Sequence, residues 1–193
     1  GQIICSTVTG NVPNVARRTF SAAIGHGNTA EDGGMALGFR NQALSSGAIA
    51  LGYLNTADTT QAFAAGTESV SHGINAMAIG QNVTAEAASS TVMGAYNFTS
   101  TGYNKYDWVE TDPLFVIGNG DETTGHDALR MLKNGSTFLY PENVTYGLYQ
   151  YSTNSNKTGT TYGIYSYNYN STATNASSVY GARISAYNGG TAN

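Results

Sequence analysis

One four-residue frame recurs every 14 residues along the first half of the chain, as Met35-Ala36-Leu37-Gly38, Ile49-Ala50-Leu51-Gly52, Phe63-Ala64-Ala65-Gly66 and Met77-Ala78-Ile79-Gly80. Looser copies flank these four, at Ala22-Ala23-Ile24-Gly25 and Thr91-Val92-Met93-Gly94. An internal repeat decides an architecture before any local propensity does. A 14-residue unit is too short for a pair of helices and fits one coil of a β-solenoid, with two short strands and two turns. The frame therefore predicts an all-β fold of stacked coils over residues 21–100.

The glycine of each frame marks an equivalent point in successive coils. Glycine reaches positive φ without strain, so we expect turns at Gly25, Gly38, Gly52, Gly66, Gly80 and Gly94. Asparagine also tolerates the left-handed region and bonds to nearby backbone. It recurs three residues after the glycine, where the chain carries Asn28, Asn41, Asn55, then Ser69, and later Asn97. A helix is the weaker alternative, because it needs a 3.6-residue period and fewer glycines than these repeats contain.

The alternation within each frame separates small from large side chains. Alternate residues of an extended strand face opposite sides. One side carries almost only alanine, which indicates a narrow space such as the lumen of a thin coil. The other side carries bulky apolar groups, which indicates a second apolar surface. Because a 14-residue coil encloses too little volume for a core of its own, we expect inter-chain core contacts at Met35, Leu37, Ile49, Leu51, Phe63, Met77 and Ile79.

Composition excludes several classes of partner. Only 10% of the residues are charged, against about 25% in ordinary soluble domains, so uncharged polar groups provide the solvation. The formal net charge is −4 with no basic patch, which argues against nucleic acid. No stretch approaches the ~18 apolar residues of a membrane span. The single Cys5 cannot form an internal disulfide.

The chain divides into four segments by sequence character. Residues 1–20 form a β-prone N-terminal segment, and residues 21–100 hold the repeats. Residues 101–141 form a β module, with a strand at 114–117 and a hairpin signal at Asn134-Gly135. Residues 142–193 are rich in Tyr, Ser, Thr and Asn. We expect this last segment to continue in a longer parent protein.

The Ala-Leu-Gly and Ala-Ile-Gly cores, with small residues five positions after the glycine, resemble the head repeats of trimeric autotransporter adhesins over residues 21–100. The segment 114–120, followed by Ala128-Leu129 and 132–135, looks like a module common in phage tail-fibre-like proteins. The resemblance implies a left-handed parallel β-roll, followed by β-rich fibre segments, in an intertwined homotrimer. It also implies an adhesive fibre on a virion tail or a bacterial cell surface. Both viruses and bacteria use these modules, so the source stays open.

A looser repeat follows in residues 142–193, at Tyr146-Gly147-Leu148-Tyr149 and Tyr162-Gly163-Ile164-Tyr165. Strand alternation places Leu148 and Ile164 inward and leaves Tyr149 and Tyr165 outward. Tyrosine has a rigid apolar face and a polar tip, which suits the binding of a glycan or protein receptor. Alternating tyrosines are also ordinary inter-chain core in a slender fibre, so both interpretations stay open.

No catalytic set emerges from the sequence, and we expect no cofactor and no metal. The histidines, at positions 26, 72 and 126, are far apart and lie in expected turns. The metal-binding alternative is a ring formed by one histidine from each chain on a trimer axis. Asp107, Glu110 and Asp112 cluster near Trp108, as in a sugar site, but a neck between two modules explains them as well.

Two function classes remain. The favoured one is a structural and adhesive trimeric fibre, with receptor-binding capacity, on a phage tail or a bacterial surface. The alternative is a tail spike that degrades polysaccharide. Such spikes have larger coils, with grooves lined by acids and aromatics, whereas a 14-residue coil leaves no such groove within one chain. We therefore predict a binding protein and not an enzyme.

Overall fold

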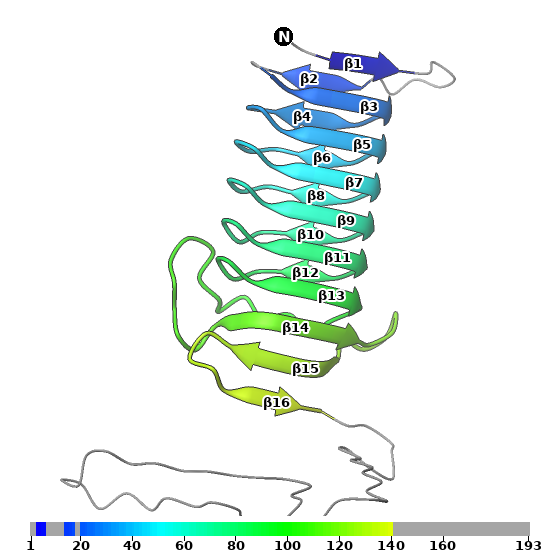
Figure 1. Cartoon of the computed structure of the whole chain (residues 1–193). Coiled ribbons are helices and arrows are strands. Elements are labelled where there is room, and N and C mark those ends of the chain that lie inside the picture. The colour runs from blue at the N-terminus through cyan, green and yellow to red at the C-terminus, as the bar shows by residue number, and fades with distance from the viewer. Residues whose placement is uncertain (1–2, 7–13, 18–19, 141–193) are drawn as a thin grey trace, which may run out of the picture. The chain divides into compact units, whose positions relative to one another are not determined.

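The computed structural model describes residues 3–6, 14–17 and 20–140, which form strands and turns without any helix. The strands belong to two sheets (Figure 1). The ten-stranded sheet contains, in spatial order, β1 (Ile3–Ser6), β3 (Ala22–His26), β5 (Met35–Phe39), β7 (Ile49–Tyr53), β9 (Phe63–Thr67), β11 (Met77–Gln81), β13 (Thr91–Ala95), β14 (Pro113–Asn119), β15 (Asp127–Leu132) and β16 (Thr137–Leu139). The six-stranded sheet contains β2 (Val15–Arg17), β4 (Thr29–Glu31), β6 (Gln42–Ala43), β8 (Thr56–Ala57), β10 (Val70–Ser71) and β12 (Thr84–Ala85).

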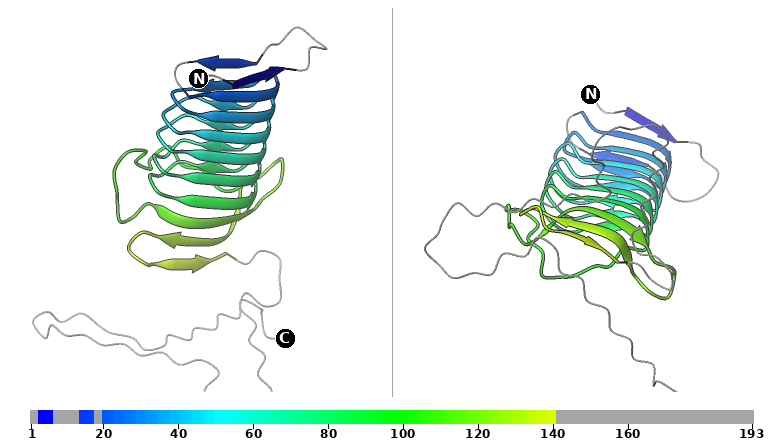
Figure 2. Two further views of the ribbon diagram at one scale, coloured as in Figure 1. Left: turned by 45° about the horizontal axis from the view of Figure 1, so that its top comes forward. Right: turned by 60° about the horizontal axis from the view of Figure 1, so that its bottom comes forward.

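Each coil contributes one five-residue strand to the first sheet and one shorter strand to the second, and every pairing between coils is parallel. The register follows the sequence frame, because Gly38 pairs with Gly25 on one side and with Gly52 on the other. Figure 2 shows the two sheets as facing walls of the stack. The all-β prediction is confirmed for the described residues, and so is a parallel β-solenoid of about 6 coils of ~14 residues.

Alanine fills the lumen between the two sheets. The second residue of the frame is a fully buried alanine in five coils and the buried Val92 in the sixth, and the inward alanines of the opposite strands are fully buried too. The first set is Ala23, Ala36, Ala50, Ala64 and Ala78, and the second is Ala30, Ala43, Ala57 and Ala85. The small side chain lets the two walls of the coil approach closely. A single chain therefore has a core of its own, and the expectation that the coil is too thin to enclose one was wrong.

A ladder of asparagines joins the coils inside the lumen. Asn41 is fully buried, and its Nδ2 donates to the carbonyl oxygens of Leu37 in its own coil and Gly52 in the next, at 2.9 and 2.6 Å. Its Oδ1 accepts the backbone N–H of Asn55 at 3.0 Å. Asn28 and Asn55 repeat the pattern, and Ser69 continues it with a hydroxyl. Each amide thus satisfies backbone groups of two coils at once.

Neither the frame glycines nor the asparagines occupy the left-handed turn position that the sequence suggests. The six glycines lie inside strands, each as the fourth of five residues. The left-handed turn residue comes two positions later, at Arg40, Leu54 and Glu68 (φ 52°, 57° and 55°). The asparagine that follows points inward. The placement of these glycines in turns was therefore wrong, although they are equivalent in every coil.

Close approach of successive coils explains the glycine column. Gly52 has φ 115°, and a methyl group on its Cα would collide with the carbonyl oxygen of Gly66. The same collision with the next coil occurs at the other five glycines. A side chain is therefore excluded both by φ and by the neighbouring backbone.

The solenoid ends in an antiparallel extension. Strand β14 pairs parallel with β13, and then β15 and β16 reverse direction. The strand expected at 114–117 lies within β14, and the turn at Asn134-Gly135 joins β15 to β16. Both of these predictions are confirmed. The loop between β13 and β14 bonds back to the coil turns, where Ile74 and Ala88 donate to the carbonyls of Lys105 and Asn104 at 2.8 Å.

We predict that Gly52→Ala lowers the free energy of unfolding by more than about 3 kcal/mol, because the methyl group meets backbone that cannot move aside. The matched control is Gly47→Ala. Gly47 also has positive φ (64°), but the nearest atom to an added methyl lies at 3.6 Å. This control should cost about 1 kcal/mol. Equal losses in urea denaturation would contradict the steric account.

We predict that Asn41→Val costs about 3 kcal/mol or more, because it leaves the Leu37 and Gly52 carbonyls and the Asn55 N–H without their partner in the lumen. Valine already occupies the equivalent lumen position at Val83, so the side chain fits the fold. The control Gln42→Val changes the exposed neighbour and should stay within about 0.5 kcal/mol of the parent. If both variants melt like the parent, the ladder does not stabilise the coils.

Candidate functional site

The outer face of the ten-stranded sheet carries two adjacent apolar columns. Cross-strand partners in the first column are Met35, Ile49, Phe63 and Met77, and those in the second are Leu37, Leu51, Ala65 and Ile79. Met35, Leu37 and Met77 are 44%, 42% and 38% exposed, and the other large side chains are half-buried. The structure thus brings the seven residues expected at inter-chain contacts onto one face, which one chain leaves uncovered. None of them lies in the lumen.

An aromatic stack borders these columns. The rings of His26, Phe39 and Tyr53 occupy the position after the frame glycine in three successive coils. Their centroids are 5.1 and 5.2 Å apart, with interplanar angles of 16° and 8°. The Arg40 guanidinium lies 5.2 Å from the Phe39 centroid. The parallel register produces this stack, because it places the same frame position of each coil side by side.

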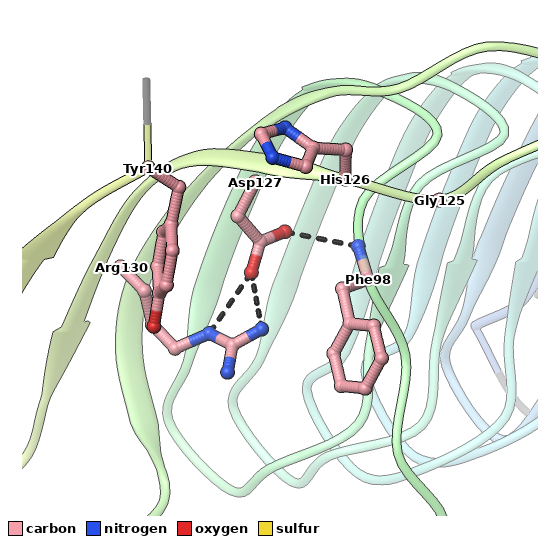
Figure 3. A pocket seen from close by; sticks show the side chains of 6 residues that line it. All are labelled: Phe98, Gly125, His126, Asp127, Arg130 and Tyr140. Atoms are coloured by element: carbon pink, nitrogen blue, oxygen red, sulfur yellow. Dashed lines mark hydrogen bonds and ion pairs between the residues drawn. The ribbon is translucent and has the colours of Figure 1, made fainter. Parts of the chain in front are cut away.

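An open pocket of about 260 Å³ lies where the last coil meets the antiparallel extension (Figure 3). Phe98 enters it from the turn after β13, and Gly125 and His126 from the loop before β15. Asp127 and Arg130 come from β15, and Tyr140 follows β16. The pocket exists because the turn after the last coil lies against strand β15. The Asp127 side chain joins the two, since it accepts the backbone N–H of Phe98, which lies 29 residues earlier in the sequence.

An ion pair organises the pocket. Asp127 is almost fully buried; its Oδ1 accepts the Phe98 backbone N–H at 2.9 Å, and its Oδ2 accepts Nε of Arg130 at 2.9 Å and also Nη2. Burial by itself lowers the pKa of Arg130, but the hydrogen bond and the negative charge of Asp127 outweigh it and raise the pKa. The guanidinium therefore stays charged and fixed, 5.2 Å from the Phe98 centroid and 5.7 Å from the Tyr140 centroid.

The histidines lie apart and have separate partners. His72 Nδ1 is 2.7 Å from Asp58 Oδ2, and His126 Nδ1 is 2.6 Å from Asn119 Oδ1. Within the described ranges, no group of three or more His, Cys, Asp or Glu side chains could hold a metal ion. A ring on a trimer axis would need other chains and stays a hypothesis.

The acids near Trp108 stabilise their own loop. Asp112 is buried and its Oδ2 accepts the Asn104 backbone N–H at 2.9 Å, while Asp107 accepts the Asn104 amide at 3.3 Å. The Lys133 ammonium lies 5.0 Å from the exposed Trp108 ring. Burial lowers the pKa of Lys133, and the charge of Asp112 opposes that shift. Both carboxylates therefore bond to groups of their own loop.

Tyr149 and Tyr165, expected to form a receptor-binding ladder, lie outside the described residues. The pocket at β15, by contrast, was not anticipated as a site. Its residues come from three separate segments, and no periodic pattern links Phe98 to Arg130 or Tyr140. The Asp127–Arg130 spacing gives no signal either, because residues three apart on a strand are expected to face opposite sides.

Comparison of the chain with known protein families, with characterised proteins and with solved structures gives no match. Among the described residues, no helix has the length and apolar character needed to cross a membrane.

Proposed function

We propose that this chain is a structural and adhesive segment of a homotrimeric fibre, a left-handed parallel β-roll displayed on a phage tail or a bacterial surface. In that role it acts as a spacer that holds the receptor-binding end of the fibre away from the phage or cell that carries it. It also attaches to a host or cell-surface glycan or protein. The resemblance of the sequence repeats to trimeric autotransporter adhesin heads, and of the following module to tail-fibre modules, supports this proposal. It assigns no catalytic residue and no cofactor.

The observation that carries the proposal is the pair of apolar columns on the outer face of the ten-stranded sheet. Three of their side chains are 38–44% exposed in one chain, and the face continues from coil to coil without a charged residue in either column between Met35 and Ile79. Contiguous exposed apolar surface of this kind marks an interaction site. A second and third copy of the same chain match it best, since identical coils present columns with identical spacing.

Other features support a fibre over a polysaccharide-degrading spike. The alanine lumen is closed, so it offers no space for a substrate. The acids Asp107 and Asp112 both bond to Asn104 in their own loop. Solvation by Ser, Thr and Asn with 10% charge is typical of extracellular β surfaces.

We predict that the full 193-residue chain sediments as a trimer at micromolar concentration, and that Leu51→Asp dissociates it. A buried unpaired charge at each of three equivalent contacts should cost several kcal/mol per trimer. The control Thr56→Asp places the same charge, at a half-buried position of the same coil, on the opposite sheet. It should remain trimeric. A folded monomer for the parent chain in analytical ultracentrifugation would contradict the proposal.

A further inference from the structure

We propose that the pocket formed by Phe98, Asp127, Arg130 and Tyr140 is a subsite for a neutral pyranose unit of a surface polysaccharide. The inference deepens the adhesive function proposed above, because it names the class of receptor and the place where it binds.

The walls of the pocket suit a sugar ring. The Phe98 side chain is 49% exposed and Tyr140 is half-buried, and Figure 3 shows the Arg130–Asp127 pair between their two rings. An aromatic face carries negative charge, and the axial C–H groups of a pyranose carry slight positive charge. A ring that packs against Phe98 or Tyr140 therefore gains both apolar contact and electrostatic attraction.

The polar groups of the pocket are already oriented. Asp127 accepts from Nε and Nη2 of Arg130, and Nη1 has no hydrogen-bond partner among the described residues. Its two N–H groups can donate to sugar hydroxyls. Because the ion pair and the two rings hold the guanidinium in place, little side-chain freedom is lost when a ligand binds.

The charge balance favours a neutral sugar over an acidic one. Asp127 neutralises Arg130 through direct hydrogen bonds, so the pocket offers no surplus positive charge. The adjoining loop carries Asp121 and Glu122, both exposed. A carboxylate or phosphate in the pocket would meet the field of these acids, and the Arg130 charge that could oppose it is already paired with Asp127.

The size of the site indicates one unit of a longer chain. Its volume of about 260 Å³ is just below the range of about 300–1,000 Å³ that drug-sized ligands occupy. A second open hollow, of about 320 Å³, shares Gly125 with the pocket. Its lining includes Asn82, Thr84, Thr99 and Thr123, which supply amide and hydroxyl groups for neighbouring sugar units.

Saturation-transfer NMR on the full 193-residue chain tests this inference. The probes are the methyl α-glycosides of glucose, galactose and mannose, and the acidic comparison is methyl α-glucuronide, which matches the glucoside in shape. We expect at least one neutral glycoside to bind, and to bind at least tenfold more tightly than the glucuronide. Preference for the glucuronide, or binding of none of the four, would overturn the inference.

Variants locate the site. Tyr140→Ala and Phe98→Ala should each weaken binding of that glycoside at least tenfold, with Tyr140→Leu and Phe98→Leu as substitutes if an alanine variant fails to fold. Tyr106→Ala is the matched control, because Tyr106 is 70% exposed and does not line the pocket; it should bind like the parent. Unchanged binding in the Tyr140 and Phe98 variants would refute the assignment.

Light scattering on the same samples separates this inference from the fibre proposal. A trimer that binds no glycoside leaves the fibre proposal intact and removes the sugar site. A monomer that binds a neutral glycoside through Tyr140 supports the sugar site and refutes the trimeric fibre.

Discussion

The asparagine ladder inside the lumen is the interaction on which the coils from Asn14 to Ser69 depend. Each lumen amide bonds backbone groups of its own coil and of its neighbours, as Asn41 does with Leu37, Gly52 and Asn55. A coil of about 14 residues turns through two tight corners, and corners leave backbone groups that strand pairing cannot satisfy. The buried amide satisfies them where no water enters. The ladder therefore fixes the spacing and the register of successive coils together.

The narrow lumen decides where side chains larger than valine go. With the lumen occupied by amides and alanine methyl groups, bulky residues such as Leu51 and Phe63 have only the outer face available. Regular stacking then aligns them into columns and aligns His26, Phe39 and Tyr53 into a stack. The same stacking ends at β14, where the chain reverses, and the reversal creates the pocket around Arg130. Surfaces for partners thus follow from a core that is too narrow for large residues.

The solenoid could be predicted from the sequence because the alanine–glycine frame repeats. Each copy of the frame indicates the same structural environment. The lumen role of Asn41 was missed, since an asparagine near a glycine is equally typical of an exposed turn. The core was underestimated because the contribution of alanine comes from close packing, which side-chain size alone does not reveal. The pocket could not be predicted: Phe98 and Arg130 meet only through the antiparallel turn of β15, and a single occurrence leaves no period to detect.

Amide hydrogen exchange at the ladder tests the central claim most directly. The backbone N–H groups of Asn28, Asn41 and Asn55 donate to side-chain oxygens of the preceding coil at 2.9, 2.9 and 3.0 Å, outside the strand pairing. We predict that they exchange as slowly as the paired amide of Ala50, within about tenfold, because both open only when coils separate. Exchange of these three amides as fast as that of the exposed loop amide of Glu122, with Ala50 still protected, would contradict the account.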